Sequence, residues 1–130
     1  PWEAIRPRAE RSEEGMEATR ELLADREGRE ITAVLTATDS TAMGALRALY
    51  DAGVKVPEQM AIVSFGGAFT AEYMQPPLTT ITLPMRAIGE QAARLLLDRI
   101  DGDTSPHRNI LLPTELTVRV SCGATLRDSA

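Results

Sequence analysis

The sequence predicts an α/β fold with a parallel sheet, and three features indicate it. Two short runs, 32–37 (TAVLTA) and 60–65 (MAIVSF), have the length and composition of buried strands. An amphipathic helical pattern separates them, which makes a strand–helix–strand unit with a right-handed crossover. Both runs are apolar at consecutive positions, as is typical of parallel strands that are covered on both faces.

Capping residues mark the expected helix ends. Ser12 with two following glutamates predicts the start of a first helix, which Gly28 is expected to end. A second helix is predicted to start at a cap formed by Asp39 or Ser40 and to end at Gly53. Gly44 and Ala45 keep this helix slim, so we expect it to pack close to the sheet. The other predicted elements are a loop over 66–77, extended segments over 79–83, 110–112 and 115–120, and a helix over 85–100.

Composition and charge exclude several classes of protein for this chain. Its 130 residues fit one domain, and 14 basic against 19 acidic residues give a net charge of −5. Arg6, Arg8 and Arg11 are interspersed with Glu10, Glu13 and Glu14, so they form a solvated mixed segment and no basic stripe for DNA. No apolar run approaches the roughly 20 residues of a membrane span, and no signal peptide is visible, so we expect no membrane partner.

Signatures of catalysis and of metal binding are missing from the sequence. No phosphate loop, GxGxxG turn or GxSxG elbow occurs, and the single Cys122 and single His107 cannot form a Cys/His metal site. One cysteine also permits no internal disulfide, which fits a reducing compartment such as the cytoplasm. We therefore expect no enzyme, no catalytic residue, no metal and no cofactor.

The candidate binding site lies where the two strand runs end. Ligands of open α/β sheets gather at the carboxyl ends of parallel strands. Thr38 and Asp39 follow the first run, and Gly66 and Gly67 follow the second. Each has a structural alternative, because Asp39 can be a helix cap and the glycine pair can be a tight turn.

Four segments, taken together and in order, resemble the carboxyl-terminal third of the lactose-repressor/galactose-repressor family. They are ATDSTAMGALRAL (37–49), VPEQMAIVSFGG (56–67), PPLTTI (76–81) and LPTELTVRVSCG (112–123). The resemblance implies a periplasmic-binding-protein-like (type I) sensor domain with two lobes, of which this chain is an incomplete part. It also implies that a small-molecule effector binds between the lobes and tunes the affinity for DNA of a helix-turn-helix head, which this chain lacks.

The resemblance divides the chain into residues 1–123, the carboxyl-terminal part of the effector-binding domain, and a polar tail, 124–130. The helix over 84–101 is expected to pack on the other lobe or on a partner chain, and a homodimer is expected. The function that follows is effector sensing in a cytoplasmic transcription regulator, acting as a repressor. A periplasmic or transport-linked solute-binding protein of the same fold is the first alternative, and a small α/β enzyme is the second.

Two positions depart from the family pattern in the pocket. The family usually has an acidic residue where this chain has Gly66, and an aromatic residue where it has Arg11. Because a guanidinium group suits carboxylate or phosphate, we hypothesise an anionic effector, such as a sugar phosphate or sugar acid, held by Arg11 and Thr38. The alternative is that Arg11 is a solvated surface residue.

Overall fold

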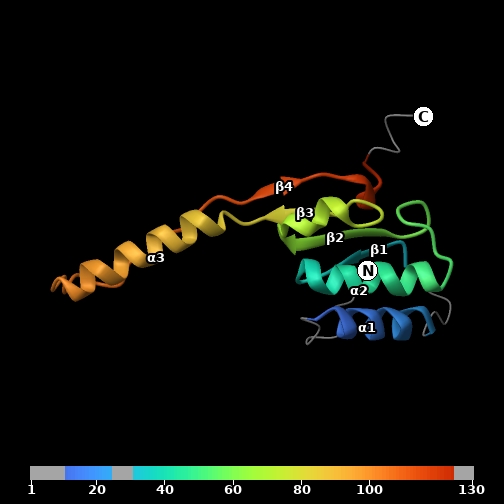
Figure 1. Cartoon of the computed structure of the whole chain (residues 1–130), viewed down its shortest axis with the longest axis horizontal. Helices are drawn as coiled ribbons and strands as arrows, with labels where there is room; N and C mark the ends of the chain where they lie inside the picture. Colours follow the sequence, from blue (N-terminus) through green and yellow to red (C-terminus); the bar gives the residue numbers. More distant parts are fainter. Residues whose placement is uncertain (1–10, 25–30, 125–130) are drawn as a thin grey trace.

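The computed structural model describes residues 11–24 and 31–124. The predicted helix end at Gly28 and residues 125–130 of the predicted tail lie outside this part of the chain. The α-helices are α1 (Ser12–Ala24), α2 (Asp39–Asp51) and α3 (Met85–Ile100), and the short 3₁₀ helices are η1 (Phe69–Tyr73) and η2 (Val120–Cys122). The strands are β1 (Ala33–Leu35), β2 (Ala61–Gly66), β3 (Thr79–Thr82) and β4 (Glu115–Thr117) (Figure 1).

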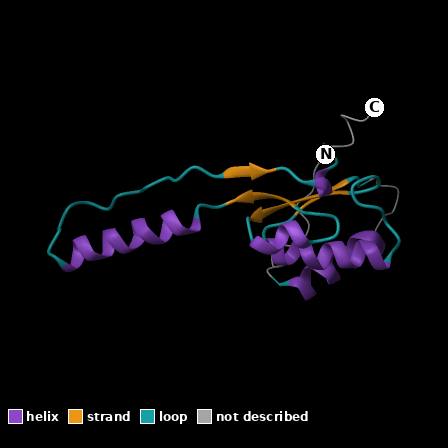
Figure 2. Ribbon diagram, turned by 45° about the horizontal axis from the view of Figure 1, so that its top comes forward, coloured by secondary structure: helices purple, strands orange, loops and turns teal. Residues whose placement is uncertain are grey.

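The four strands form one sheet in the order β1-β2-β3-β4. β1 pairs with β2 and β2 with β3 in parallel, with Leu35 opposite Val63 and Val63 opposite Thr79. β4 returns antiparallel to β3, with Thr117 opposite Thr80, so the sheet is mixed at this edge (Figure 2). The predicted parallel strand–helix–strand unit is therefore confirmed.

The prediction that the first strand is buried on both faces is wrong for the described structure. β1 has only three residues and is the edge strand, and α1 and α2 both lie on the same side of the sheet (Figure 1). Val34 points toward that side and packs on the core, whereas the Leu35 side of β1 is left bare and Leu35 is 74% exposed. In β1, a run of consecutive apolar residues therefore does not indicate that both faces of the strand are covered.

The core lies between α2 and the sheet and is aliphatic. Its buried members are Ala42, Ala45, Leu46, Leu49, Met60, Ile62, Ala71 and Leu78. Gly44 was expected to bring α2 close to the sheet, but it faces α1 instead. A Cβ on Gly44 would lie 1.8 Å from the backbone oxygen of Ser12, and one on Gly15 would lie 2.3 Å from that of Thr41. The two glycines therefore allow the backbones of α1 and α2 to touch, while Ala45 packs in the core.

The structure adds detail to three predicted segments. The predicted loop over 66–77 contains the 3₁₀ helix η1, and 110–112 forms no strand. The extended segment predicted over 115–120 pairs only as far as Thr117 and then turns into η2. The turn has a physical cause, because buried Ser121 donates from its hydroxyl to the oxygen of Ile62 and from its N–H to that of Pro77.

α3 has the predicted bounds and projects away from the rest of the structure as an arm, with the chain returning beside it to β4 (Figures 1 and 2). None of its residues is buried. Large apolar side chains, among them Met85, Leu96 and Ile100, are exposed along it. The described residues leave this stripe uncovered, and its packing on another lobe or chain stays a prediction.

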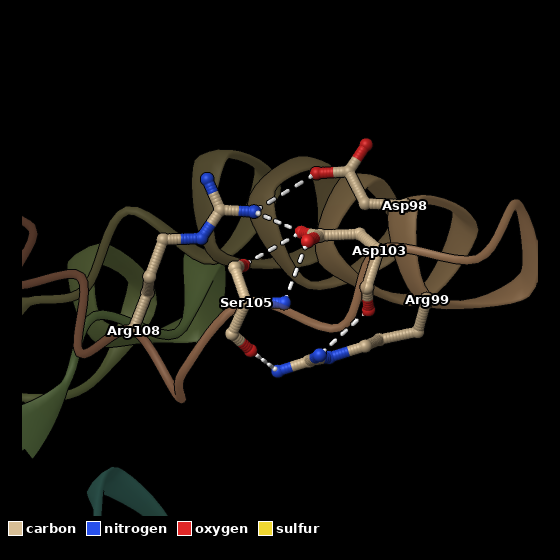
Figure 3. Close-up of polar contacts among 5 residues, drawn as sticks. All are labelled: Asp98, Arg99, Asp103, Ser105 and Arg108. Atoms are coloured by element: carbon tan, nitrogen blue, oxygen red, sulfur yellow. Dashed lines mark hydrogen bonds and ion pairs between the residues drawn. The ribbon is translucent and has the colours of Figure 1, made fainter.

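Polar contacts close the tip of the arm (Figure 3). The Arg99 guanidinium donates to the backbone oxygens of Asp103 and Ser105, each at 2.6 Å. Arg108 bridges the carboxylates of Asp98 and Asp103 at 3.1 and 3.3 Å. Hydrogen bonds from the Ser105 N–H and hydroxyl lower the pKa of Asp103. These contacts tie the returning chain to the last turn of α3.

Candidate functional site

Thr38 is the residue that caps α2, at the carboxyl end of β1. Its backbone is extended (φ −143°, ψ 156°), and its hydroxyl oxygen accepts from the Thr41 N–H at 3.1 Å. The prediction of Asp39 or Ser40 as the cap is therefore wrong, because both already lie inside the helix. Asp39 is free to use its side chain elsewhere.

Asp39 is the centre of a buried hydrogen-bond network at the same edge. Its side chain, in a residue only 5% exposed, accepts from the hydroxyl of Ser64 on β2 and, at 2.7 Å, from that of Thr80 on β3. Its second oxygen accepts from the backbone N–H of Ala68 at 2.5 Å. One carboxylate thus joins the first turn of α2 to two strands and to the loop after β2.

The environment of Asp39 favours its charged form. Burial on its own would raise the pKa of the carboxyl group, but hydrogen bonds from Ser64, Ala68 and Thr80, with a smaller effect of the nearby Gly67 N–H, together outweigh it and lower the pKa. The carboxylate is therefore ionised at neutral pH, at the amino-terminal end of a helix, where negative charge is stabilised.

Gly67 holds the loop after β2 against β3. Its N–H donates to the Thr80 hydroxyl at 3.2 Å, and its φ of 77° is unfavourable for residues with a side chain. A Cβ there would lie 2.7 Å from the Cα of Thr82. A Cβ on Gly66 would lie 3.1 Å from an Asp39 carboxylate oxygen. The glycines therefore form a tight turn, as in the structural alternative, beside the candidate site.

Arg11 lies just before α1, next to the start of α2. The Gly15 N–H donates to the Arg11 oxygen and the Arg11 N–H to a Glu14 carboxylate oxygen, so Arg11 occupies the cap position that was predicted for Ser12. The Ser12 hydroxyl instead bonds that of Ser40 on α2 at 3.0 Å. The Arg11 side chain is 80% exposed, and its Nε lies 3.9 Å from Glu14.

The structure thus brings together Thr38, Asp39, Gly66 and Gly67, and it places Arg11 on the adjacent helix end. The sequence reasoning missed Ser64 and Thr80. Both are hydroxyl residues inside short apolar strands, and that was the available signal, because a buried hydroxyl group needs a hydrogen-bond partner.

The groups exposed near this edge include hydroxyls and the Arg11 guanidinium. Ser12 and Ser40 present hydroxyls near the start of α1 and α2, while the Asp39 carboxylate is buried. In the part of the chain that the structure describes, no three Asp, Glu, His or Cys side chains gather as they would around a metal ion. None of the helices there is long and apolar enough to cross a membrane.

Comparison with known proteins agrees with this architecture. Residues 2–122 match the family model of the periplasmic binding protein-like domain. The chain is 47% identical over 96 residues to the HTH-type transcriptional repressor MelR of Bacillus subtilis (strain 168), covering 74% of this chain and 28% of that protein. The chain spans less than a third of the length of MelR and of the similar regulator CelR of Thermobifida fusca.

Solved structures give the same result and confirm the predicted fold class. A complex of the transcriptional regulator CelR with cellobiose matches with a TM-score of 0.79 and 38% identity, over 85% of this chain and 33% of that one. The lac repressor dimer bound to operator and the anti-inducer ONPF matches with a TM-score of 0.77 and 31% identity, over 86% and 33%. The chain therefore belongs to the lactose-repressor/galactose-repressor family of transcription regulators, through its periplasmic binding protein-like domain.

Proposed function

We propose that this chain is part of the effector-sensing domain of a DNA-binding repressor, and that it carries out no catalysis. The observation that carries the proposal is the match of most of the chain to transcription regulators, one of them solved with cellobiose. The hydroxyl-rich edge around Thr38, Ser12 and Ser40 supports a sugar-type effector, since hydroxyl groups donate and accept hydrogen bonds to sugar hydroxyls.

The effector of this proposal carries an anionic group, which Arg11 and Thr38 bind. Two observations support this. The acid of the site, Asp39, is buried and already accepts several hydrogen bonds, and Gly66 adds no carboxylate. The Arg11–Glu14 pair is exposed and 3.9 Å long, so it is weak and an effector anion can displace Glu14.

DNA, on this proposal, is bound by a helix-turn-helix head outside this chain, whose own charge is −5. The regulator then acts in the cytoplasm, as a homodimer. The exposed stripe on α3 is in keeping with packing on the other lobe or on a partner chain, because a contiguous apolar surface of this kind is unusual in water.

The test is a thermal-shift screen of the intact regulator against neutral and anionic sugars, followed by gel shifts on its own promoter. An effector that binds only the folded state raises the melting temperature. The proposal expects one sugar class to do so and to change DNA binding. A protein that binds sugars but never DNA would instead be a solute-binding protein, and one that consumes the sugar would be an enzyme.

A further inference from the structure

We propose that Asp39 is a positioning residue of the effector site: it does not touch the effector, and it fixes the loop 66–68, on which the effector rests, both directly at Ala68 and through Thr80 at Gly67. The inference rests on the proposed function only in assuming that this edge of the sheet binds an effector. The hydrogen bonds that it invokes are those of the chain itself.

Asp39 has little capacity left for a ligand. One oxygen accepts from two hydroxyls, those of Ser64 and Thr80, and the other accepts from the Ala68 N–H. The residue is almost completely buried. Contact with an effector would have to displace one of these bonds, so the carboxylate acts on the site through the groups that it holds.

Thr80 links the Asp39 carboxylate to the loop by two hydrogen bonds. A threonine hydroxyl has one hydrogen to donate, and Thr80 donates it to Asp39. The hydroxyl oxygen is then left to accept from the Gly67 N–H, at 3.2 Å. Asp39 thus fixes Gly67 through Thr80 and fixes Ala68 directly.

The loop 66–68 cannot move closer to β3 when these hydrogen bonds are lost. Gly67 already lies against Thr82, where even a Cβ would approach the backbone to 2.7 Å. When the Thr80 hydroxyl is lost, the loop can only move away from β3. We therefore expect a specific change of the Gly67 and Ala68 amides rather than a general loosening of the sheet.

Thr79 offers a matched control on the adjacent position. It is as buried as Thr80, and its hydroxyl bonds the backbone of Arg119, with no link to the loop. Thr79→Val and Thr80→Val therefore remove the same group from the same strand. Thr80→Ser keeps the hydroxyl and is the rescue variant.

The first experiment measures amide hydrogen exchange by NMR on the chain without any ligand. Thr80→Val is expected to speed exchange at Gly67 by about tenfold, the worth of one hydrogen bond, whereas Thr79→Val speeds it near Arg119 and leaves Gly67 unchanged. Thr80→Ser restores protection. Asp39→Asn is expected to act mainly at Ala68, because an amide nitrogen placed there cannot accept its N–H. Equal exchange at Gly67 in the two valine variants would overturn the proposal.

The second experiment uses the intact regulator and whichever sugar passes the thermal-shift screen, with cellobiose, lactose and ribose among the probes. Thr80→Val is expected to weaken binding at least fivefold, while Thr79→Val, at comparable loss of stability, leaves it unchanged. A bound structure with a sugar hydroxyl on the Asp39 carboxylate would make Asp39 a ligand and refute its positioning role. If no sugar binds, the proposed function fails, and the exchange experiment still decides the role of Asp39.

Discussion

The Asp39 carboxylate accepts a hydrogen bond at 2.7 Å from the hydroxyl of Thr80, a residue 41 positions later in the chain. Neither residue is exposed. The bond connects the amino-terminal turn of α2 to the third strand of the sheet. It gives the carboxyl edge of the sheet a charged, buried centre, whose contribution to stability depends on pH.

Asp39→Asn is predicted to lower the free energy of unfolding at pH 7 by about 1–3 kcal/mol, the cost of leaving a buried donor unsatisfied. Asp39 has a pKa below its ordinary 3.8 in the folded chain. Its contribution is therefore complete above that unfolded value and is lost as pH falls toward the folded one. Urea unfolding of both proteins between pH 7 and pH 2 measures this.

The difference in free energy of unfolding between wild type and Asp39→Asn is expected to stay constant from pH 7 to about pH 4.5 and to become smaller below about pH 4. The pKa of Asp103 is also lowered, so its protonation in acid destabilises wild type and Asp39→Asn alike. Only the difference in free energy of unfolding between the two proteins therefore reports on Asp39. A gap that widened in acid would contradict the prediction.

Gly67→Ala is predicted to destabilise the chain by about 1–3 kcal/mol, because it adds a Cβ at positive φ and presses it against Thr82. Gly102→Ala is the matched control. Gly102 also has a positive φ, 98°, but no atom lies within 4 Å of its Cβ position. The excess loss in Gly67→Ala, measured by urea unfolding, isolates the close approach of loop and strand. Equal losses would argue that the contact is unimportant.

Gly44→Ala tests the contact between α1 and α2. A methyl group at this position would meet the Ser12 backbone at 1.8 Å, so the helices must separate, and a loss of about 2 kcal/mol or more is expected. Gly89→Ala, in the open middle of α3, is expected to stabilise by up to about 1 kcal/mol, since alanine is the better helix former. Thermal unfolding followed by circular dichroism distinguishes them, and a neutral Gly44→Ala would contradict the observed packing.

Local patterns were sufficient to predict α3 and the parallel unit of β1, α2 and β2. Each depends on apolar spacing within one segment, together with the chirality of crossovers. The same patterns could not predict which face of α2 meets which neighbour. Gly44 was therefore placed against the sheet, whereas it contacts α1.

The position of the candidate site could be predicted from the sequence, but its hydrogen-bond network could not. The rule that ligands gather at strand ends led to Thr38, Asp39, Gly66 and Gly67, which the structure brings together. It could not show that Asp39 is buried under Ser64 and Thr80, because these partners are 25 and 41 residues away. Long-range hydrogen bonds leave no periodic trace in a sequence, and only the hydroxyls inside apolar strands hinted at them.

Arg11→Ala tests the class of effector in the intact regulator. If Arg11 binds an anionic group, its loss should weaken binding of the anionic sugar by about 1.5–3 kcal/mol, the worth of a hydrogen bond to a charged group. Arg20→Ala is the matched control, because Arg20 lies within α1, is half exposed and also pairs with a carboxylate, that of Asp51 at 3.7 Å. Glu14→Gln removes the charge that competes for Arg11 and should strengthen anion binding slightly. Calorimetry with a sugar, its phosphate and its acid, at two salt concentrations, measures the effects of the three substitutions. Because salt screens charges, the preference for the anionic sugar should be weaker at the higher salt concentration. Tight binding of a neutral sugar, indifferent to Arg11→Ala, would rule out the anionic effector and leave Arg11 as a solvated helix cap.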